Sequence, residues 1–187
     1  MYSRLLLQER DYQSLEKFLI ESYNDFLKDK LFDRSNHNEN LTLLTYLSNC
    51  LYKTKKYKQS LKYSEELLSG MKEYDCFLHD KYLFYYYNIL VLNYAKTDKE
   101  KALDYLNKAS RSEVIKKIPS YNAFIYLNRS LIYYYQNNFK ESQKNIARLI
   151  IQEVFLLLDK SSQLKILVTE LMIRISISNK NHDNKLK

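Results

Sequence analysis

The sequence predicts an all-α protein, and three observations lead to this fold class. First, the 187 residues include one Gly and one Pro, which leaves little turn chemistry for β-hairpins. Second, apolar residues make up 45% of the chain, so a substantial core can form among helix-favouring residues such as Leu, Lys and Glu. Third, one pattern of small residues, aromatic residues and polar turns returns along the chain. This pattern is typical of two helices joined by a turn.

The recurring unit is a helical hairpin whose second helix usually opens on an aromatic residue. Tyr12, Tyr57 and Phe139 occupy this place, and Lys99 takes it in the third unit. The unit returns about every 40–45 residues. A hairpin of two helices cannot bury its apolar faces alone, so the units must stack against one another.

Small residues recur at a fixed spacing inside the unit. Ser48 and Ser60 are 12 residues apart, and Ser130 and Ser142 repeat this interval. We expect each pair to lie where the two antiparallel helices of a hairpin approach closely. The spacing between units varies more, because the linkers carry no such constraint.

In the first half of the chain, the apolar periodicity predicts helices over 1–9, 11–31, 40–54, 57–71 and 77–96. The helix 1–9 is amphipathic, and the helix 11–31 is the second helix of a hairpin. Between the second and third helices, the polar segment DRSNHNEN (33–40) is expected to be a linker. The helix 57–71 carries a stripe on one face, formed by Tyr57, Ser60, Leu61, Ser64 and Leu68.

In the second half, we expect helices over 98–111, 120–136, 139–158 and 162–178. The first and third of these carry apolar stripes, formed by Ala102, Leu103, Leu106 and Ala109, and by Phe139, Ser142, Ile146, Leu149 and Ile150. The helix 120–136 follows the single Pro119, which favours a helix start. We therefore expect one helical repeat domain over 1–178 and a disordered tail over 179–187.

The repeat resembles the tetratricopeptide repeat (TPR) family over nearly the whole chain, to about residue 178. The matching residues are Leu44, Leu47, Ser48, Tyr52, Tyr57 and Ser60 in one unit, Tyr86, Ile89, Tyr94, Ala102 and Ala109 in the next, and Tyr126, Ser130, Tyr133, Phe139 and Ser142 in the last. The resemblance implies antiparallel helix-hairpin repeats, about nine helices in all, stacked as a short right-handed α-solenoid.

The resemblance also implies a concave groove lined by the first helix of each hairpin, where partner peptides bind. Carried over to this sequence, the partner-binding residues are Asn49, Tyr52, Lys53, Phe84, Tyr87, Val91, Tyr94, Leu127, Leu131 and Tyr134. This groove is aromatic and apolar, which suits an amphipathic helix or an extended apolar peptide. Aromatic residues at helical spacing also pack between helices, so each of these residues has a structural interpretation as well.

The sequence offers no catalytic, cofactor or metal site, and we expect no enzyme. Gly70 is the only Gly, so no Gly-rich phosphate loop exists. Cys76 and His79 are three residues apart, but two ligands do not make a zinc site. The two cysteines, Cys50 and Cys76, are expected to be reduced thiols in a cytoplasmic protein. We expect no secretory signal and no membrane span, because charged or polar residues interrupt the apolar stretches 149–158 and 164–177.

Three functional hypotheses remain open at this point. The first is a non-catalytic scaffold or sensor module, within a larger regulatory protein or alone, that binds a protein or peptide in the aromatic groove. The second is a basic helical-repeat protein that binds RNA or single-stranded nucleic acid, although the net charge of +8 is spread along the chain and does not favour this by itself. The third is self-assembly, as a homodimer through the apolar helix 162–178.

Overall fold

The protein is all-helical, as predicted. A computed structural model describes residues 2–185, and in this range the chain is 81% helix without any β-strand. The chain divides into two compact units, Met1–Asn93 (unit 1) and Tyr94–Lys187 (unit 2). The expected single domain over 1–178 therefore corresponds to two compact units, which are described separately below.

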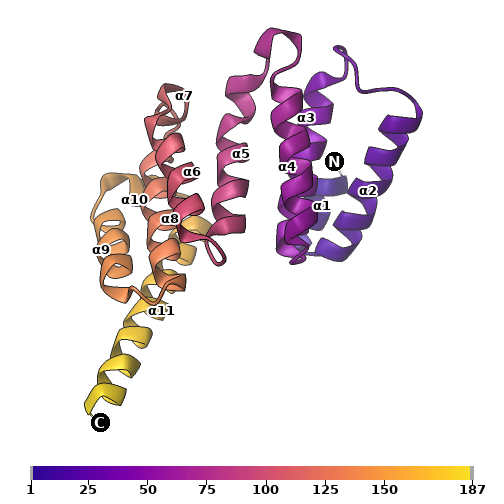
Figure 1. The fold of residues 1–187 in the computed structure, drawn as a ribbon. Coiled ribbons are helices and arrows are strands. Elements are labelled where there is room, and N and C mark those ends of the chain that lie inside the picture. The colour runs from indigo at the N-terminus through magenta and orange to yellow at the C-terminus, as the bar shows by residue number, and fades with distance from the viewer. Residues whose placement is uncertain (1, 186–187) are drawn as a thin grey trace. The chain divides into compact units, whose positions relative to one another are not determined.

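Unit 1 consists of consecutive helices that pack against their neighbours in the chain. They are α1 (Tyr2–Glu9), α2 (Tyr12–Lys28), α3 (His37–Lys53), α4 (Tyr57–Met71), the short 3₁₀ helix η1 (Tyr74–Cys76) and α5 (His79–Tyr94), whose last residue belongs to unit 2 (Figure 1). Helix α2 packs against α1 and α3, and α3 packs along α4. Their shared core is built from Leu6, Leu15, Leu19, Leu43, Leu47, Cys50 and Leu51.

Unit 2 repeats this neighbour-to-neighbour packing. Its helices are α6 (Lys99–Arg111), α7 (Glu113–Lys116), α8 (Tyr121–Tyr135), α9 (Phe139–Ile150), α10 (Glu153–Leu157) and α11 (Lys160–Lys185). Helix α8 packs against α6 and along α9, and α9 packs against α11. The core at the α9–α11 contact contains Ala123, Ile146, Leu149, Ile166 and Ile173.

The hairpin turns share one backbone geometry. Arg10, Lys55 and Asn137 each adopt a positive φ, of 58°, 65° and 56°, one or two residues after the end of the first helix of a hairpin. The next amide in each turn donates to a carbonyl five residues back: Asp11 to Leu6, Lys56 to Leu51, and Asn138 to Tyr133, at 2.8–3.0 Å. This helix-ending motif places an aromatic residue first in the following helix. The predicted openings at Tyr12, Tyr57 and Phe139, and the opening at Lys99, are all confirmed.

The predicted small-residue contacts are also confirmed. The Ser60 hydroxyl donates to the Ser48 carbonyl at 2.8 Å, and the Ser130 hydroxyl donates to the Ser142 carbonyl at 2.9 Å. All four residues are fully buried. Helix α5 also reaches this contact, because the Asn93 side-chain amide donates to the Ser60 hydroxyl at 3.0 Å.

The helix boundaries differ from the predictions where backbone caps intervene. The described part of the chain holds eleven α-helices rather than about nine. Ser112 leaves helical geometry and caps the extra helix α7 by accepting from the Ile115 amide. Gln152 is extended, with φ −87° and ψ 146°, and this divides the predicted helix 139–158 into α9 and α10.

Two helices extend further than predicted. Helix α3 starts at His37, inside the expected linker 33–40, because Asp33 accepts hydrogen bonds from the amide and side chain of Asn36 and ends the loop early. At the other end, α11 runs beyond 178 to Lys185, through residues expected to form a disordered tail. This segment lacks Gly and Pro, so no residue type there stops a helix. Residues 186–187 of the expected tail lie outside the described residues.

Candidate functional site

Six of the predicted groove residues lie in unit 1, on α3 and α5. On α3, the Asn49 side chain donates to the Thr45 carbonyl at 2.9 Å, and the Tyr52 ring lies 5.7 Å from the Tyr57 ring of α4. Lys53 is exposed, and its ammonium lies 5.8 Å from the Tyr52 ring centroid. Of these contacts, the Tyr52–Tyr57 ring contact joins the end of α3 to the start of α4.

On α5, the three predicted residues differ in their surroundings. Phe84 and Tyr87 are half-buried, and their rings contact those of their neighbours Tyr85 and Tyr86. Val91 is fully buried, so it belongs to the core and is not available to a partner. Its assignment to a binding surface is not consistent with this position.

The other four predicted residues lie in unit 2, where α11 covers part of the surface that was expected to be a groove. Leu127 and Tyr134, both on α8, pack against the core at the α9–α11 contact, and the Ser176 hydroxyl of α11 donates to the Tyr134 hydroxyl at 3.4 Å. Leu131 is half-buried on the same helix, and the Tyr94 ring stacks on Tyr105 at 5.8 Å. Most of these side chains therefore take part in packing within the unit.

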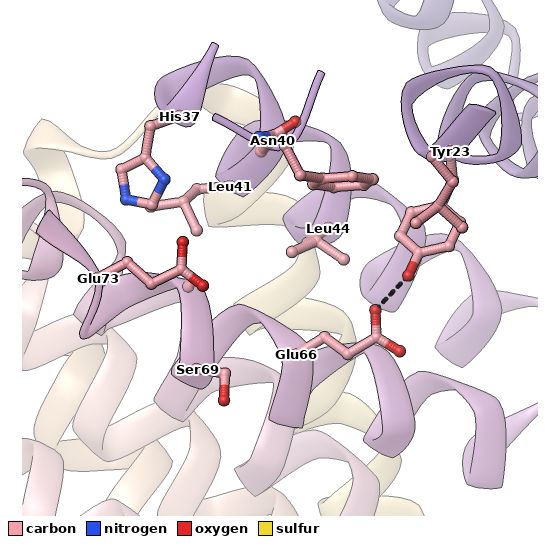
Figure 2. Close-up of a pocket in the computed structure, with 11 residues that line it drawn as sticks. Tyr23, His37, Asn40, Leu41, Leu44, Glu66, Ser69 and Glu73 are labelled. Atoms are coloured by element: carbon pink, nitrogen blue, oxygen red, sulfur yellow. Dashed lines mark hydrogen bonds between the residues drawn. The ribbon is translucent and has the colours of Figure 1, made fainter. Parts of the chain in front are cut away.

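The sequence did not reveal a pocket of about 320 Å³ in unit 1, formed by α2, α3, α4 and the α2–α3 loop (Figure 2). Its apolar wall is formed by Tyr23, Leu27, Phe32, Leu41 and Leu44. Its polar wall contains His37 and Asn40 from α3, and Glu66, Ser69 and Glu73 from α4 and its C-terminal end. The pocket is large enough for a small molecule.

Two polar atoms in this pocket are buried without a hydrogen-bond partner in the described part of the chain. They are Nε2 of His37 and Oδ1 of Asn40, on side chains that are 3% and 4% exposed. The other side of the Asn40 amide donates to the Leu31 carbonyl at 3.3 Å, which fixes the orientation of the side chain. An unpartnered buried polar atom costs about 1–3 kcal/mol, so these two atoms mark a place where a ligand group would be stabilising.

The two carboxylates of the pocket have different surroundings. Glu66 accepts a hydrogen bond of 2.6 Å from the Tyr23 hydroxyl and lies 3.7 Å from the Lys62 ammonium. Burial, together with this carboxylate, raises the pKa of Tyr23 well above its usual range, so the hydroxyl stays a donor. The exposed Glu73 carboxylate has no hydrogen-bond or ion-pair partner among the described residues. No Lys or Arg lines the pocket.

The only glycine of the chain shapes the floor of this pocket. A Cβ atom on Gly70 would lie 2.7 Å from Cδ2 of Leu41, closer than real Cβ contacts. The absence of a side chain on α4 therefore lets α3 approach at the level of the pocket. This is a close-approach role, because Gly70 has no positive φ.

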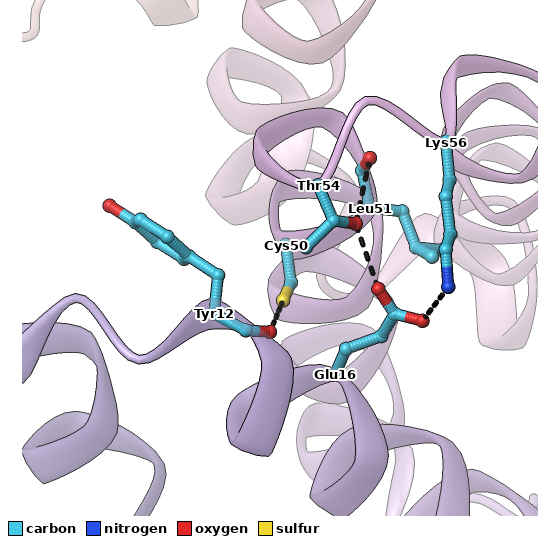
Figure 3. A network of polar contacts seen from close by, with 6 residues as sticks. All are labelled: Tyr12, Glu16, Cys50, Leu51, Thr54 and Lys56. Carbon is cyan, nitrogen blue, oxygen red and sulfur yellow. Dashed lines mark hydrogen bonds and ion pairs between the residues drawn. The ribbon is translucent and has the colours of Figure 1, made fainter.

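A separate polar network joins α2 to the α3–α4 turn (Figure 3). The buried Glu16 carboxylate accepts from the Thr54 hydroxyl at 2.8 Å and forms an ion pair with Lys56. Next to it, the Cys50 thiol donates to the Tyr12 carbonyl at 3.3 Å. Burial is the main cause that raises the pKa of the Cys50 thiol to about 11, and the Glu16 charge adds to it. A neutral, buried thiol is a structural group rather than a nucleophile.

The described residues hold no group of three or more His, Cys, Asp or Glu side chains that could bind a metal ion. Cys76 is exposed, with its thiol 3.9 Å from the Lys72 carbonyl, and Nδ1 of His79 lies 3.1 Å from the Asp80 carboxylate.

The exposed large apolar residues of unit 2 lie mainly on α10, on α11 and at Ile151, the residue that follows α9. Ile151, Leu156 and Leu157 are 84%, 74% and 83% exposed. On α11, the exposed large residues are Leu164, Leu167, Val168, Leu171, Met172 and Ile175. We call these nine residues the outer apolar face. Single exposed apolar residues are ordinary, but six of them on one side of α11 mark an interaction surface.

The outer apolar face exists because α11 is apolar on two opposite sides. Ile166 and Ile173 are seven residues apart and fully or almost fully buried against α9. At about 100° per residue, the exposed Leu164, Leu171 and Ile175 fall on the opposite side of the helix. The apolar richness of 162–178 in the sequence was the signal for this surface.

Comparisons of the chain with protein-family models, with curated proteins and with solved structures return no match. Within the described residues, no helix is long and apolar enough to span a membrane.

Proposed function

We propose that this chain is a TPR-like, non-catalytic interaction module that self-associates through the outer apolar face. The observation that carries the proposal is the set of nine large apolar side chains on α10, on α11 and at Ile151 after α9, each 45–84% exposed. Burying such side chains is worth about 1.5–3 kcal/mol each when they become fully covered, so the face is a strong driving force for association. The repeated turn geometry and the serine contacts support the TPR-like hairpin architecture.

The partner that fits this face is a second copy of the chain. Leu164, Val168, Leu171 and Ile175 follow one another at intervals of four, three and four residues. This is the seam spacing of helices that pack side by side. In an antiparallel pair with twofold symmetry, Leu164 would lie opposite Ile175, and Val168 opposite Leu171, so every central contact would be apolar.

The charges beside the seam are compatible with such a pair. Lys165 is exposed on one flank, and on the other flank the Arg174 guanidinium already binds the Glu170 carboxylate. No acidic or basic residue lies within the seam itself. The aromatic-groove hypothesis stays a prediction, and so does nucleic-acid binding.

The test is the absolute mass of the full chain by light scattering across a concentration series. We expect twice the chain mass for the natural sequence, and the mass of a single chain for the double variant Val168→Glu/Leu171→Glu. Phe77→Glu is the matched control, because Phe77 is 71% exposed but belongs to unit 1 and is not one of the nine residues of this face. A natural chain that stays monomeric at every concentration contradicts the proposal, and so does a control that dissociates as fully as the double variant.

A further inference from the structure

The geometry points to a second binding function, in unit 1 and independent of the self-association proposed for unit 2: the pocket between α2, α3 and α4 binds a small organic amine in its protonated form. Three features of the pocket support this ligand class: the sign of its charges, its unpartnered buried atoms and its apolar wall. Each of these restricts the class of ligand.

The charge in the pocket is negative, although the chain as a whole carries +8. Glu66 and Glu73 contribute carboxylates, Ser69 adds a hydroxyl, and no Lys or Arg lines the pocket. These three residues are three and four positions apart, so they lie along one side of α4 and its C-terminal end (Figure 2). The Glu66 carboxylate is already paired with the Lys62 ammonium at 3.7 Å and bonded to the Tyr23 hydroxyl, so Glu73 contributes the uncompensated negative charge. A cation is attracted to this wall, whereas a phosphate or carboxylate is repelled.

The facing wall, at the start of α3, completes a set of hydrogen-bond acceptors. Oδ1 of Asn40 is buried and unpartnered among the described residues, and it can only accept. Nε2 of His37 is unpartnered as well, and it accepts when the neutral ring carries its proton on Nδ1. An ammonium group has three donors and no acceptor, so it matches Asn40, His37 and the Glu73 carboxylate of the same pocket, which has no partner among the described residues.

The rest of the pocket requires a compact apolar body on the ligand. Tyr23, Leu27, Phe32, Leu41 and Leu44 form its apolar wall. The Tyr23 ring is held in place by its hydroxyl bond to Glu66 and lies 5.4 Å from the Phe32 ring in an edge-to-face arrangement. A volume of about 320 Å³ is at the small end of ligand pockets, so an arylalkyl or alkyl amine fits better than a larger molecule.

The direct test uses three probes that share one ring but differ in charge, with binding to the full chain followed by calorimetry and ligand-observed NMR. They are 2-phenylethylamine (cation), 2-phenylethanol (neutral) and 3-phenylpropanoate (anion). We expect the amine to bind about tenfold more tightly than the alcohol, because a charge-assisted hydrogen bond is roughly twice as strong as a neutral one. The anion should not bind measurably.

Variants then locate the site. Glu66→Gln/Glu73→Gln keeps the size of both side chains and removes both charges, and we expect about tenfold weaker binding of the amine. Glu65→Gln is the matched control, since Glu65 is exposed on α4 but does not line the pocket. Asn40→Leu removes the buried acceptor and should weaken the binding of 2-phenylethylamine.

Several outcomes would overturn the proposal. Amine and alcohol binding with equal affinity would show an apolar pocket without charge recognition. An unchanged affinity in the double variant, or an equal loss in Glu65→Gln, would place the amine elsewhere. Because dimerisation is measured separately by light scattering, failure of amine binding leaves the proposal for the outer apolar face untouched, and the reverse also holds.

Discussion

Ser130 and Ser142 exchange hydrogen bonds across the α8–α9 hairpin. Each hydroxyl donates to the backbone carbonyl of the other residue, at 2.9 and 2.8 Å, and the two hydroxyl oxygens lie 3.1 Å apart. Both side chains are fully buried. Small residues are therefore required at this crossing for two reasons, since they allow the backbones to approach and they satisfy their own buried hydroxyls.

This contact predicts that size matters more than polarity at position 142. Ser142→Ala should lower the free energy of unfolding by about 1 kcal/mol, the usual net worth of one hydrogen bond. Ser142→Val should cost about 1–3 kcal/mol more, because added methyl groups would force the two helices apart. Urea denaturation measures both changes. Gln143→Val, at the exposed neighbouring position, is the control, and an equal loss there would contradict the close-approach argument.

The second prediction concerns the positive φ of the hairpin turns. Lys55 has φ 65° between α3 and α4, a conformation that costs a residue with a Cβ atom about 1–2 kcal/mol. Lys55→Gly should therefore raise the free energy of unfolding by up to about 1 kcal/mol, after the larger entropy loss of Gly is subtracted. Lys58→Gly, in the first turn of α4 where φ is helical, should do the opposite. Thermal and urea unfolding of both variants would decide, and a destabilised Lys55→Gly would mean that the turn has another conformation.

The third prediction concerns the buried Glu16 carboxylate. Glu16→Gln keeps the shape but weakens the contacts with Thr54 and Lys56, and we expect a loss of about 1–2 kcal/mol in unfolding free energy. This loss of unfolding free energy is smaller than expected for a fully buried ion pair, because the Lys56 side chain is 51% exposed. The exposed pair Lys17–Glu21 gives the comparison: Glu21→Gln should change stability by less than about 0.5 kcal/mol. Equal effects at the two positions would argue against a special role of the α2 network.

The hairpins could be predicted from sequence because their signals are local. An aromatic residue after the turn and small residues 12 positions apart both lie within one hairpin, and neither signal depends on how the hairpins pack against one another. The ends of α9 and α3 were harder to predict, since they depend on a single extended residue, Gln152, and on one side-chain cap, Asp33.

The candidate sites were predicted less well, for a physical reason. The groove residues came from a resemblance, and whether each is exposed depends on what packs over it, as the buried Val91 shows. The pocket could not be read from sequence at all, because His37 and Glu73 are brought together only when α3 packs along α4 (Figure 2). By contrast, the excess of apolar residues in 162–178 was visible, because a helix with more apolar residues than one face can bury must expose some of them.

The last prediction concerns the two thiols, which should differ strongly in reactivity. The pKa of Cys50 is raised to about 11, so only about one molecule in a thousand carries a Cys50 thiolate at pH 8, and its side chain is 2% exposed. Cys76 is exposed. Native protein treated with a thiol-specific reagent at pH 8 should therefore be labelled once, at Cys76, and urea-unfolded protein twice.

Cys76→Ser should abolish rapid labelling, while Cys50→Ser should leave it unchanged. Raising the pH towards 11 should speed Cys50 labelling, because a larger fraction of the Cys50 thiol is then deprotonated. Rapid labelling of Cys50 at pH 8 in the folded protein would mean that α2 does not cover it as Figure 3 shows.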